Sequence, residues 1–317
     1  MTSIIALVPD VQAQALQKLK DICSEYRIDF FGNISEEDYS DIEILLGWNS
    51  NVNRVIEQLQ GLKWIQLESA GIDYLPQVVL DNPSIRISTT SGIHASAITE
   101  SVFAYILSYG RGMYQTIQAQ QDREWLPIPS DQLKTLPGKT MLIFGTGNIG
   151  KELARMASAF GMKVRGVNTD GRDVKHFSKC FRLDEALSII NTAHIVVNAM
   201  PLTQDTHSFF NLKFFQDMNP DSLFINVGRG SSVVEKDLYI AVKDKLIAGA
   251  YLDVFEKEPL ENDSPLWTNE NIIITPHITG KMHDYDEKLF PIFVENLCEY
   301  LKNGQIKRNL VDSKKGY

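Results

Sequence analysis

Polar residues that could bind a small carboxylate and transfer a proton follow three consecutive predicted strands near the end of the chain. Arg229 lies in INVGRG, acids at Asp253, Glu256 and Glu258 follow in DVFEKEP, and His277 lies in TPHITG. A guanidinium between glycines offers two parallel N–H donors to a carboxylate. A carboxylate beside an imidazole stabilises its protonated form and fixes its tautomer. We interpret Arg229 as a candidate substrate ligand and His277, with a neighbouring acid, as a candidate acid–base pair.

The stretch GTGNIG indicates a dinucleotide-binding turn. It directly follows the predicted strand MLIF and opens a stretch with helical spacing of apolar residues. In such a turn Gly145 would permit the tight bend, Gly147 would let the backbone approach a pyrophosphate, and Gly150 would allow close packing of helix on strand. The helix N-terminus would add free N–H groups and the positive end of its dipole. The alternative is a tight strand–helix turn without a ligand.

The stretch VNTDGR follows this unit and bears on the choice of cofactor. Asn168 lies 18 residues after Gly150, near the place where an NAD-binding turn has an Asp or Glu that holds the ribose. Asn168 and Thr169 could donate hydrogen bonds to a 2′-phosphate, and Arg172 could form a charge-assisted pair with it. We therefore expect a preference for NADP(H), with NAD(H) possible. The alternative is that Asn168 bonds an NAD ribose and Asp170 restores the carboxylate.

The elements around these motifs alternate between strands and helices, which predicts an α/β fold with two doubly wound parallel-sheet domains. Five short strands alternate with helical stretches in the first ninety residues, a buried helix spans 95–109, and six strands follow from residue 140. A last helical stretch, in which Pro291 should produce a kink or a new start, needs a docking surface. We expect a discontinuous flavodoxin-like substrate domain (1–95 and 284–317), a Rossmann cofactor domain (96–283), and an interdomain cleft.

Composition narrows the classes of partner. The chain has 317 residues, 44% of them hydrophobic, and a formal net charge of −9. That charge repels nucleic acid and anionic lipid, and no apolar stretch is long enough for a membrane span. The three cysteines lie far apart without metal-ligand spacing, so we expect neither disulfides nor a metal site. We expect a cytoplasmic protein that binds neither nucleic acid nor membranes.

Five motifs stand in a fixed order along the chain: GTGNIG, NAMPLTQDT, INVGRG, GAYLDVFEKEPL and TPHITG. In this order they resemble the D-isomer-specific 2-hydroxyacid dehydrogenase family over nearly the whole chain. The resemblance implies a homodimeric enzyme that passes a hydride from a nicotinamide to the C2 carbonyl of a small 2-keto acid. Arg229 would bind the substrate carboxylate, His277 would be the acid–base, and Glu258 its partner. ESAGID resembles the family's substrate loop, which implies substrate contacts from Ser69, Ala70 and Gly71.

The same resemblance implies a set of residues that contact the dinucleotide. They lie in the motifs named above and in VNTDGR. The set is Gly145, Gly147, Asn148, Ile149, Gly150, Asn168, Thr169, Arg172, Pro201, Thr206, Val227, Gly228, Asp253 and Gly280.

Two other functions share this pattern. A dinucleotide-sensing protein like the carboxy-terminal-binding corepressors would retain a similar triad, and consumption of reduced cofactor with a keto acid would separate it from an enzyme. Formate dehydrogenase is disfavoured, because that branch has an amide where this chain has Glu258. His94 stands where the family often has Asn, and we interpret it as a hinge or packing residue. The natural substrate stays open among glyoxylate, hydroxypyruvate and larger 2-keto acids.

Overall fold

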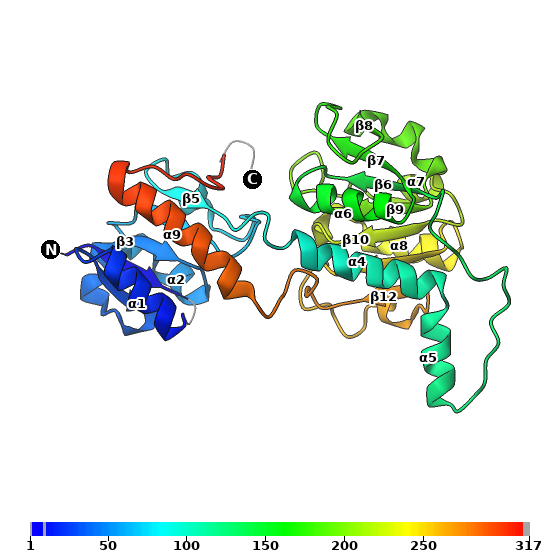
Figure 1. Ribbon diagram of the computed structural model, residues 1–317, viewed down its shortest axis with the longest axis horizontal. Helices are drawn as coiled ribbons and strands as arrows, with labels where there is room; N and C mark the ends of the chain where they lie inside the picture. Colours follow the sequence, from blue (N-terminus) through cyan, green and yellow to red (C-terminus); the bar gives the residue numbers. More distant parts are fainter. Residues whose placement is uncertain (1, 9–10, 313–317) are drawn as a thin grey trace. The chain divides into compact units, whose positions relative to one another are not determined.

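The chain divides into two compact units, each with its own parallel sheet. The computed structural model describes residues 2–8 and 11–312, and the end of the expected first domain, 313–317, lies outside the described residues. The first unit comprises 1–93 and 282–317, and the second comprises 94–281 (Figure 1). Two parallel-sheet α/β units confirm the predicted fold class. Among the described residues, no helix combines the length and apolar character needed to cross a membrane.

The first unit contains a five-stranded parallel sheet in the order β2-β1-β3-β4-β5. This is the flavodoxin-like order of doubly wound folds. The strands are short and largely buried because helices cover both faces. Their bounds are β1 Ile4–Leu7, β2 Arg27–Phe30, β3 Ile42–Leu46, β4 Trp64–Gln66 and β5 Arg86–Ser88.

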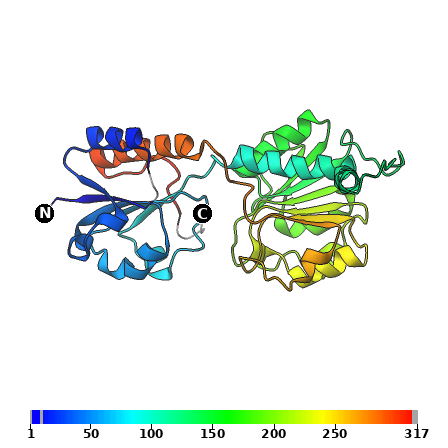
Figure 2. The same cartoon turned by 90° about the horizontal axis from the view of Figure 1, so that it is seen from below.

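Helices cover both faces of this sheet (Figure 2). On one face α1 (Ala13–Ile22) and α9 (Tyr285–Asn303) pack their apolar residues on the strands. On the other lie α2 (Ser50–Val55), α3 (Gln77–Leu80) and the 3-10 helices η1 (Phe31–Asn33), η2 (Glu36–Asp41) and η3 (Ile56–Gln58).

Pro291 does not start α9 afresh, although a new start was one of the two outcomes expected from the sequence. The helix runs without interruption from Tyr285 to Asn303 with Pro291 inside it. Leu289 before the proline, and Phe293 and Leu297 after it, are buried against the sheet. This packing on both sides of the proline offsets the one backbone hydrogen bond that proline cannot donate.

The second unit contains seven parallel strands in the order β12-β11-β10-β9-β6-β7-β8, which is the doubly wound order of dinucleotide-binding sheets. The sequence predicted six of them and missed β8, because KCFR is short, charged at both ends and lies at the sheet edge. The bounds are β6 Thr140–Phe144, β7 Lys163–Asn168, β8 Lys179–Arg182, β9 Ile195–Asn198, β10 Leu223–Asn226, β11 Gly249–Leu252 and β12 Ile272–Ile274.

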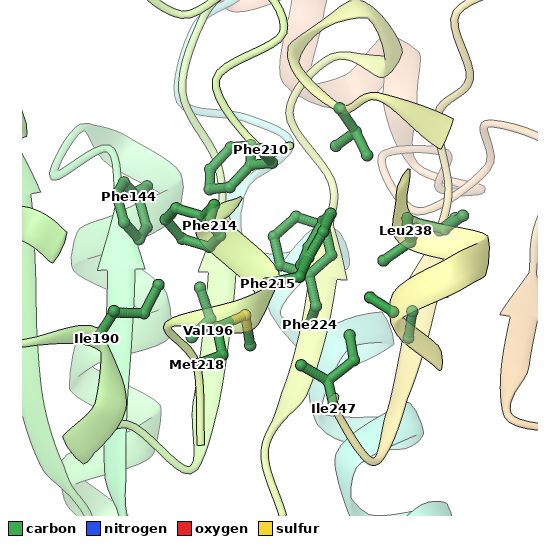
Figure 3. Close-up of a cluster of buried hydrophobic side chains, with 14 of the residues drawn as sticks. Phe144, Ile190, Val196, Phe210, Phe214, Phe215, Met218, Phe224, Leu238 and Ile247 are labelled. Carbon is green, nitrogen blue, oxygen red and sulfur yellow. The ribbon is translucent and has the colours of Figure 1, made fainter. Parts of the chain in front are cut away.

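One face of the second sheet is covered by α4 (Ala95–Gly110), the predicted buried helix, together with α6 (Asn148–Ala159). The other is covered by α7 (Leu212–Gln216), α8 (Glu235–Lys243) and short helices, over a core rich in phenylalanine (Figure 3). These short 3-10 helices are η4 (Leu183–Ser188), η5 (Ile190–Thr192), η6 (Gly230–Ser232) and η7 (Pro265–Thr268).

A further helix, α5 (Met113–Gln121), was not predicted. Its sequence, MYQTIQAQQ, carries no charged residue and only a weak apolar stripe, so helical periodicity gave little signal. With the loop that follows, α5 extends away from the rest of its unit (Figure 1). Several of its apolar side chains are consequently exposed to solvent.

Candidate active site

The three predicted catalytic residues follow adjacent strands of the second sheet. Arg229 lies three residues after β10, Glu258 six residues after β11, and His277 three residues after β12. These strands pair in parallel as β10–β11 and β11–β12. Their carboxyl ends therefore meet at one edge of the sheet, where open α/β sheets bind ligands.

His277 and Glu258 form a direct pair. The Nδ1 atom of His277 lies 2.8 Å from Oε2 of Glu258. The other carboxylate oxygen, Oε1, accepts a hydrogen bond from the Phe255 N–H at 3.0 Å. Because an ionised carboxylate only accepts hydrogen bonds, Nδ1 carries a hydrogen. The His277 side chain is 54% exposed, so its other nitrogen can meet a ligand from solvent.

The backbone of His277 is held in an uncommon conformation by Asp253. His277 has φ 52°, in the left-handed region that non-glycine residues rarely adopt. Its N–H donates to the Asp253 carbonyl at 2.9 Å. The buried Asp253 carboxylate accepts from Thr275 Oγ1 at 2.5 Å, Ile278 N at 2.9 Å, and Thr279 N and Oγ1 at 3.1 and 2.6 Å. Asp253, expected to contact cofactor, thus fixes the His277 loop with both oxygens.

A buried polar network fixes the loop that carries Arg229. The Arg229 carbonyl accepts from Asn226 Nδ2 at 3.1 Å and from Ser232 Oγ at 2.6 Å. Asn198 Nδ2 donates to Asn226 Oδ1 at 2.9 Å and to Ser232 Oγ at 2.8 Å. The guanidinium donates through Nη1 to the Gly228 carbonyl at 2.9 Å. This network was not predicted, although the sequence has an asparagine at the end of each of two buried strands.

The loop of Arg229 also contacts the turn that carries Glu258. A Cβ atom added to Gly230 would lie 1.8 Å from the carbonyl carbon of Phe255. Only glycine permits this approach of two backbones. Since the Phe255 N–H also binds Glu258, the position of Arg229 and that of Glu258 are mechanically linked.

The turn between β6 and α6 has the shape that a dinucleotide requires. Gly145 has φ 96°, and an added Cβ would lie 2.6 Å from the Ala199 carbonyl oxygen. At Gly150 a Cβ would lie 2.0 Å from the Gly145 carbonyl oxygen. At Gly147 it would meet no atom within 4 Å. The fold itself therefore requires the first and third glycines, whereas the open space over Gly147, beside the N-terminus of α6, fits a pyrophosphate.

The Asn168 side chain shapes the turn after β7. Its Oδ1 accepts from Gly171 N at 2.7 Å, and its Nδ2 donates to the Arg172 carbonyl at 3.0 Å and to Thr146 Oγ1 at 3.2 Å. Both amide N–H donors are engaged, so Asn168 is not placed to donate to a phosphate as the sequence suggested. Arg172 forms an exposed ion pair with Asp170 at 2.8 Å.

The remaining predicted cofactor residues also follow strands at this edge. Thr206 Oγ1 donates to the Pro201 carbonyl at 2.8 Å and fixes the loop after β9. Ile149 lies in the first turn of α6, Thr169 is exposed after β7, and Val227 and Gly228 directly follow β10.

Gly280 follows β12, and its carbonyl lies 3.2 Å from Nδ1 of His94. An added Cβ at Gly280 would meet the His94 ring at 3.4 Å. His94 therefore packs on the end of the His277 loop. This contact supports a packing role for His94 rather than a catalytic one.

The predicted substrate loop lies in the first unit, after β4. Ser69 Oγ donates to the Gly71 carbonyl at 2.7 Å and lies 2.8 Å from the Tyr74 hydroxyl. The Glu68 carbonyl accepts from the Tyr285 hydroxyl. Burial raises the pKa of the Glu68 carboxyl group, and the charge of Asp286 adds to this. The Ser69 hydroxyl thus shapes the loop.

With this geometry established, comparison with known proteins assigns the family. Residues 103–279 match the model of the D-isomer specific 2-hydroxyacid dehydrogenase, NAD binding domain. The chain belongs to the D-isomer specific 2-hydroxyacid dehydrogenase family. It is therefore an NAD(P)-dependent oxidoreductase, and the residues that match the NAD-binding model lie within its second unit.

Individual relatives of this dehydrogenase agree. Glyoxylate/hydroxypyruvate reductase B of Shigella boydii is 31% identical over 86% of this chain and 86% of its own. A D-isomer specific 2-hydroxyacid dehydrogenase family protein from Aeromonas salmonicida superposes with a TM-score of 0.87 at 31% identity, over 99% of this chain and 100% of its own. A probable 2-hydroxyacid dehydrogenase from Rhizobium etli, solved with NADP, gives 0.80 at 25% identity over 99% of each chain.

Proposed function

We propose that this dehydrogenase reduces the C2 carbonyl of a small 2-keto acid, with His277 as the proton donor. The observation that carries the proposal is the 2.8 Å contact between His277 and Glu258 at the ligand-binding edge of the sheet. Glyoxylate and hydroxypyruvate are the first candidate substrates, because the Shigella boydii relative is named for them.

Each polar residue then has one task. The Arg229 guanidinium binds the substrate carboxylate and polarises the neighbouring carbonyl. His277 holds a proton at Nε2 for the carbonyl oxygen, and Glu258 keeps the imidazole oriented through Nδ1. A dinucleotide held with its pyrophosphate at the glycine turn would supply the hydride from its reduced nicotinamide.

We further propose that NADP(H) is the preferred dinucleotide. Asn168 replaces the carboxylate that would repel a 2′-phosphate, and it folds the turn that presents Thr169 and Arg172 to solvent. The Rhizobium etli relative, solved with NADP, supports the same choice. NAD(H) remains the alternative if Asp170 binds the ribose.

A homodimer is the assembly we propose. Met113 and Ile117 on α5, and Trp125 and Leu126 in the loop after it, are exposed, Trp125 to 98%. Exposed apolar surface of this kind marks an interaction site, and the uncharged α5 is a place where two copies of a chain of net charge −9 can approach. Replacing Trp125 and Ile117 by Asp should give a monomer in analytical ultracentrifugation, and an unchanged mass would reject this surface.

The reaction is tested with a panel of 2-keto acids against NADPH and NADH, followed by nicotinamide absorbance. The proposal expects at least one small 2-keto acid to be reduced, faster with NADPH than with NADH. A protein that binds NADPH tightly yet oxidises it with no keto acid of the panel would be a dinucleotide sensor instead.

A further inference from the structure

We propose that Arg182 is a second cation of the adenosine 2′-phosphate site, opposite Arg172. The inference rests on the proposed preference for NADP(H). No motif marks Arg182, because its strand, β8, is not predicted from the sequence. The sheet, however, brings it beside the turn of residues 168–172.

The pairing of β7 with β8 places Arg182 next to Asn168. The two strands are parallel, and Asn168 and Arg182 are direct partners, each the last residue of its strand. Partners in a parallel ladder direct their side chains to the same face of the sheet, about 4.8 Å apart. Asn168 reaches Thr146 in the glycine turn on that face. The side chain of Arg182 therefore leaves the sheet on the same face as that of Asn168. It also lies at the same carboxyl edge as the turn of residues 168–172.

The side chain of Arg182 runs along the turn itself. Gly171 has φ 71°, and a Cβ added to it would lie 3.2 Å from Cγ of Arg182. The aliphatic stem thus passes beside the middle of the turn, between Asp170 and Arg172. Arg172 is therefore carried by the turn, and the aliphatic stem of Arg182 lies against it.

Each of the two arginines forms an exposed ion pair with a carboxylate two residues away in the chain. Arg182 Nε lies 3.2 Å from Asp184, with side chains 57% and 71% exposed, and Arg172 lies 2.8 Å from Asp170, with 62% and 56% exposed. Exposed pairs of this kind contribute little to stability. A phosphate with close to two negative charges forms stronger, two-pronged pairs with guanidinium groups. Exchange of Asp184 for phosphate is therefore favourable.

The Asn168 contacts leave a phosphate without this amide as a donor. With its two N–H donors engaged by the Arg172 carbonyl and by Thr146 Oγ1, Asn168 offers no donor to a phosphate. That leaves the Thr169 hydroxyl and the guanidinium groups, and a single exposed arginine would be a weak basis for discrimination.

The test measures binding rather than turnover. Isothermal titration calorimetry compares 2′,5′-ADP with ADP, which lacks the 2′-phosphate, on wild type, Arg172→Ala and Arg182→Ala. The matched control is Arg155→Ala, an exposed arginine of α6 paired locally with Glu152 at 2.6 Å. Thermal unfolding of each variant verifies that it folds, which we expect because the Arg182 contact is exposed.

We expect Arg182→Ala to weaken 2′,5′-ADP about tenfold, the loss of one hydrogen bond to a charged group, with ADP unchanged and Arg155→Ala like wild type. Arg182→Lys should fall between. If wild type prefers 2′,5′-ADP and Arg172→Ala removes that preference while Arg182→Ala does not, the inference is wrong but the NADP(H) proposal stands. If wild type shows no preference for 2′,5′-ADP, the cofactor proposal fails first.

Discussion

The imidazole of His277 and the carboxylate of Glu258 lie 2.8 Å apart, although they are carried by loops after different strands. Asp253 fixes the first loop through four hydrogen bonds. The second loop is fixed by the Glu258 contact to Phe255 and by the close approach of Gly230. The two loops therefore hold the pair at the carboxyl edge of the sheet.

Glu258→Gln should leave a slower enzyme whose loss of activity at high pH begins at lower pH than in wild type. An amide at this position can still bond Nδ1, but it no longer stabilises a positive imidazolium. The pH dependence of kcat for keto acid reduction measures this. Superimposable profiles would assign the supporting role to another acid, or to none.

Arg229→Lys keeps the positive charge but loses the planar fork of donors. We expect KM for the keto acid to rise about tenfold or more, in line with one lost hydrogen bond to a charged group. NADPH affinity, measured by fluorescence, should stay within error. Wild-type KM in the lysine variant would exclude two-pronged binding of the substrate carboxylate.

The three glycines of the nucleotide turn should respond differently to alanine. Gly150→Ala places a Cβ 2.0 Å from the Gly145 carbonyl oxygen, so it should lower the free energy of unfolding by about 1–3 kcal/mol. Gly147→Ala meets open space and should unfold like wild type, yet bind NADPH about tenfold more weakly, because the methyl group occupies the pyrophosphate position. Calorimetric unfolding and binding titrations compare the two. Intact NADPH binding in a stable Gly147→Ala protein would place the pyrophosphate elsewhere.

His194 should make the second unit less stable in mild acid. Burial lowers the pKa of His194 from 6.5, and Lys139 adds to this, while its Nδ1 accepts a hydrogen bond from the Thr140 N–H at 3.2 Å. Because the folded state binds its proton less readily than the unfolded state, this contribution is complete above the unfolded value and is lost as pH falls toward the folded value.

His194→Asn keeps an acceptor without titrating. Its melting temperature should fall less than that of wild type between about pH 7.5 and pH 5. His207→Asn, at an exposed histidine beside Ser208, is the control. Equal pH dependence of wild type and His194→Asn would remove His194 from the acid response.

The sequence predicted the features that depend on local pattern. Buried strands such as TMLIF and the glycine turn carry their signal in consecutive residues, and the residues after β10, β11 and β12 converge because parallel strands end at one edge. It missed β8 and α5, whose sequences have weak periodicity. Three features could not be predicted: the hydrogen bonds of Asn168, the contacts by which Asp253 fixes the His277 loop, and the position of Arg182. They depend on strand register and side-chain geometry, which a single sequence does not specify.

The central claim, that His277 delivers the proton in a reduction of a 2-keto acid, is tested by mixing the protein with NADPH and glyoxylate or hydroxypyruvate and following nicotinamide absorbance. Wild type should form one 2-hydroxy acid for each NADPH consumed. His277→Ala should bind NADPH normally but turn over about 10²–10⁴-fold more slowly, the range for a lost general acid. Turnover of His277→Ala close to wild type at neutral pH would contradict the account.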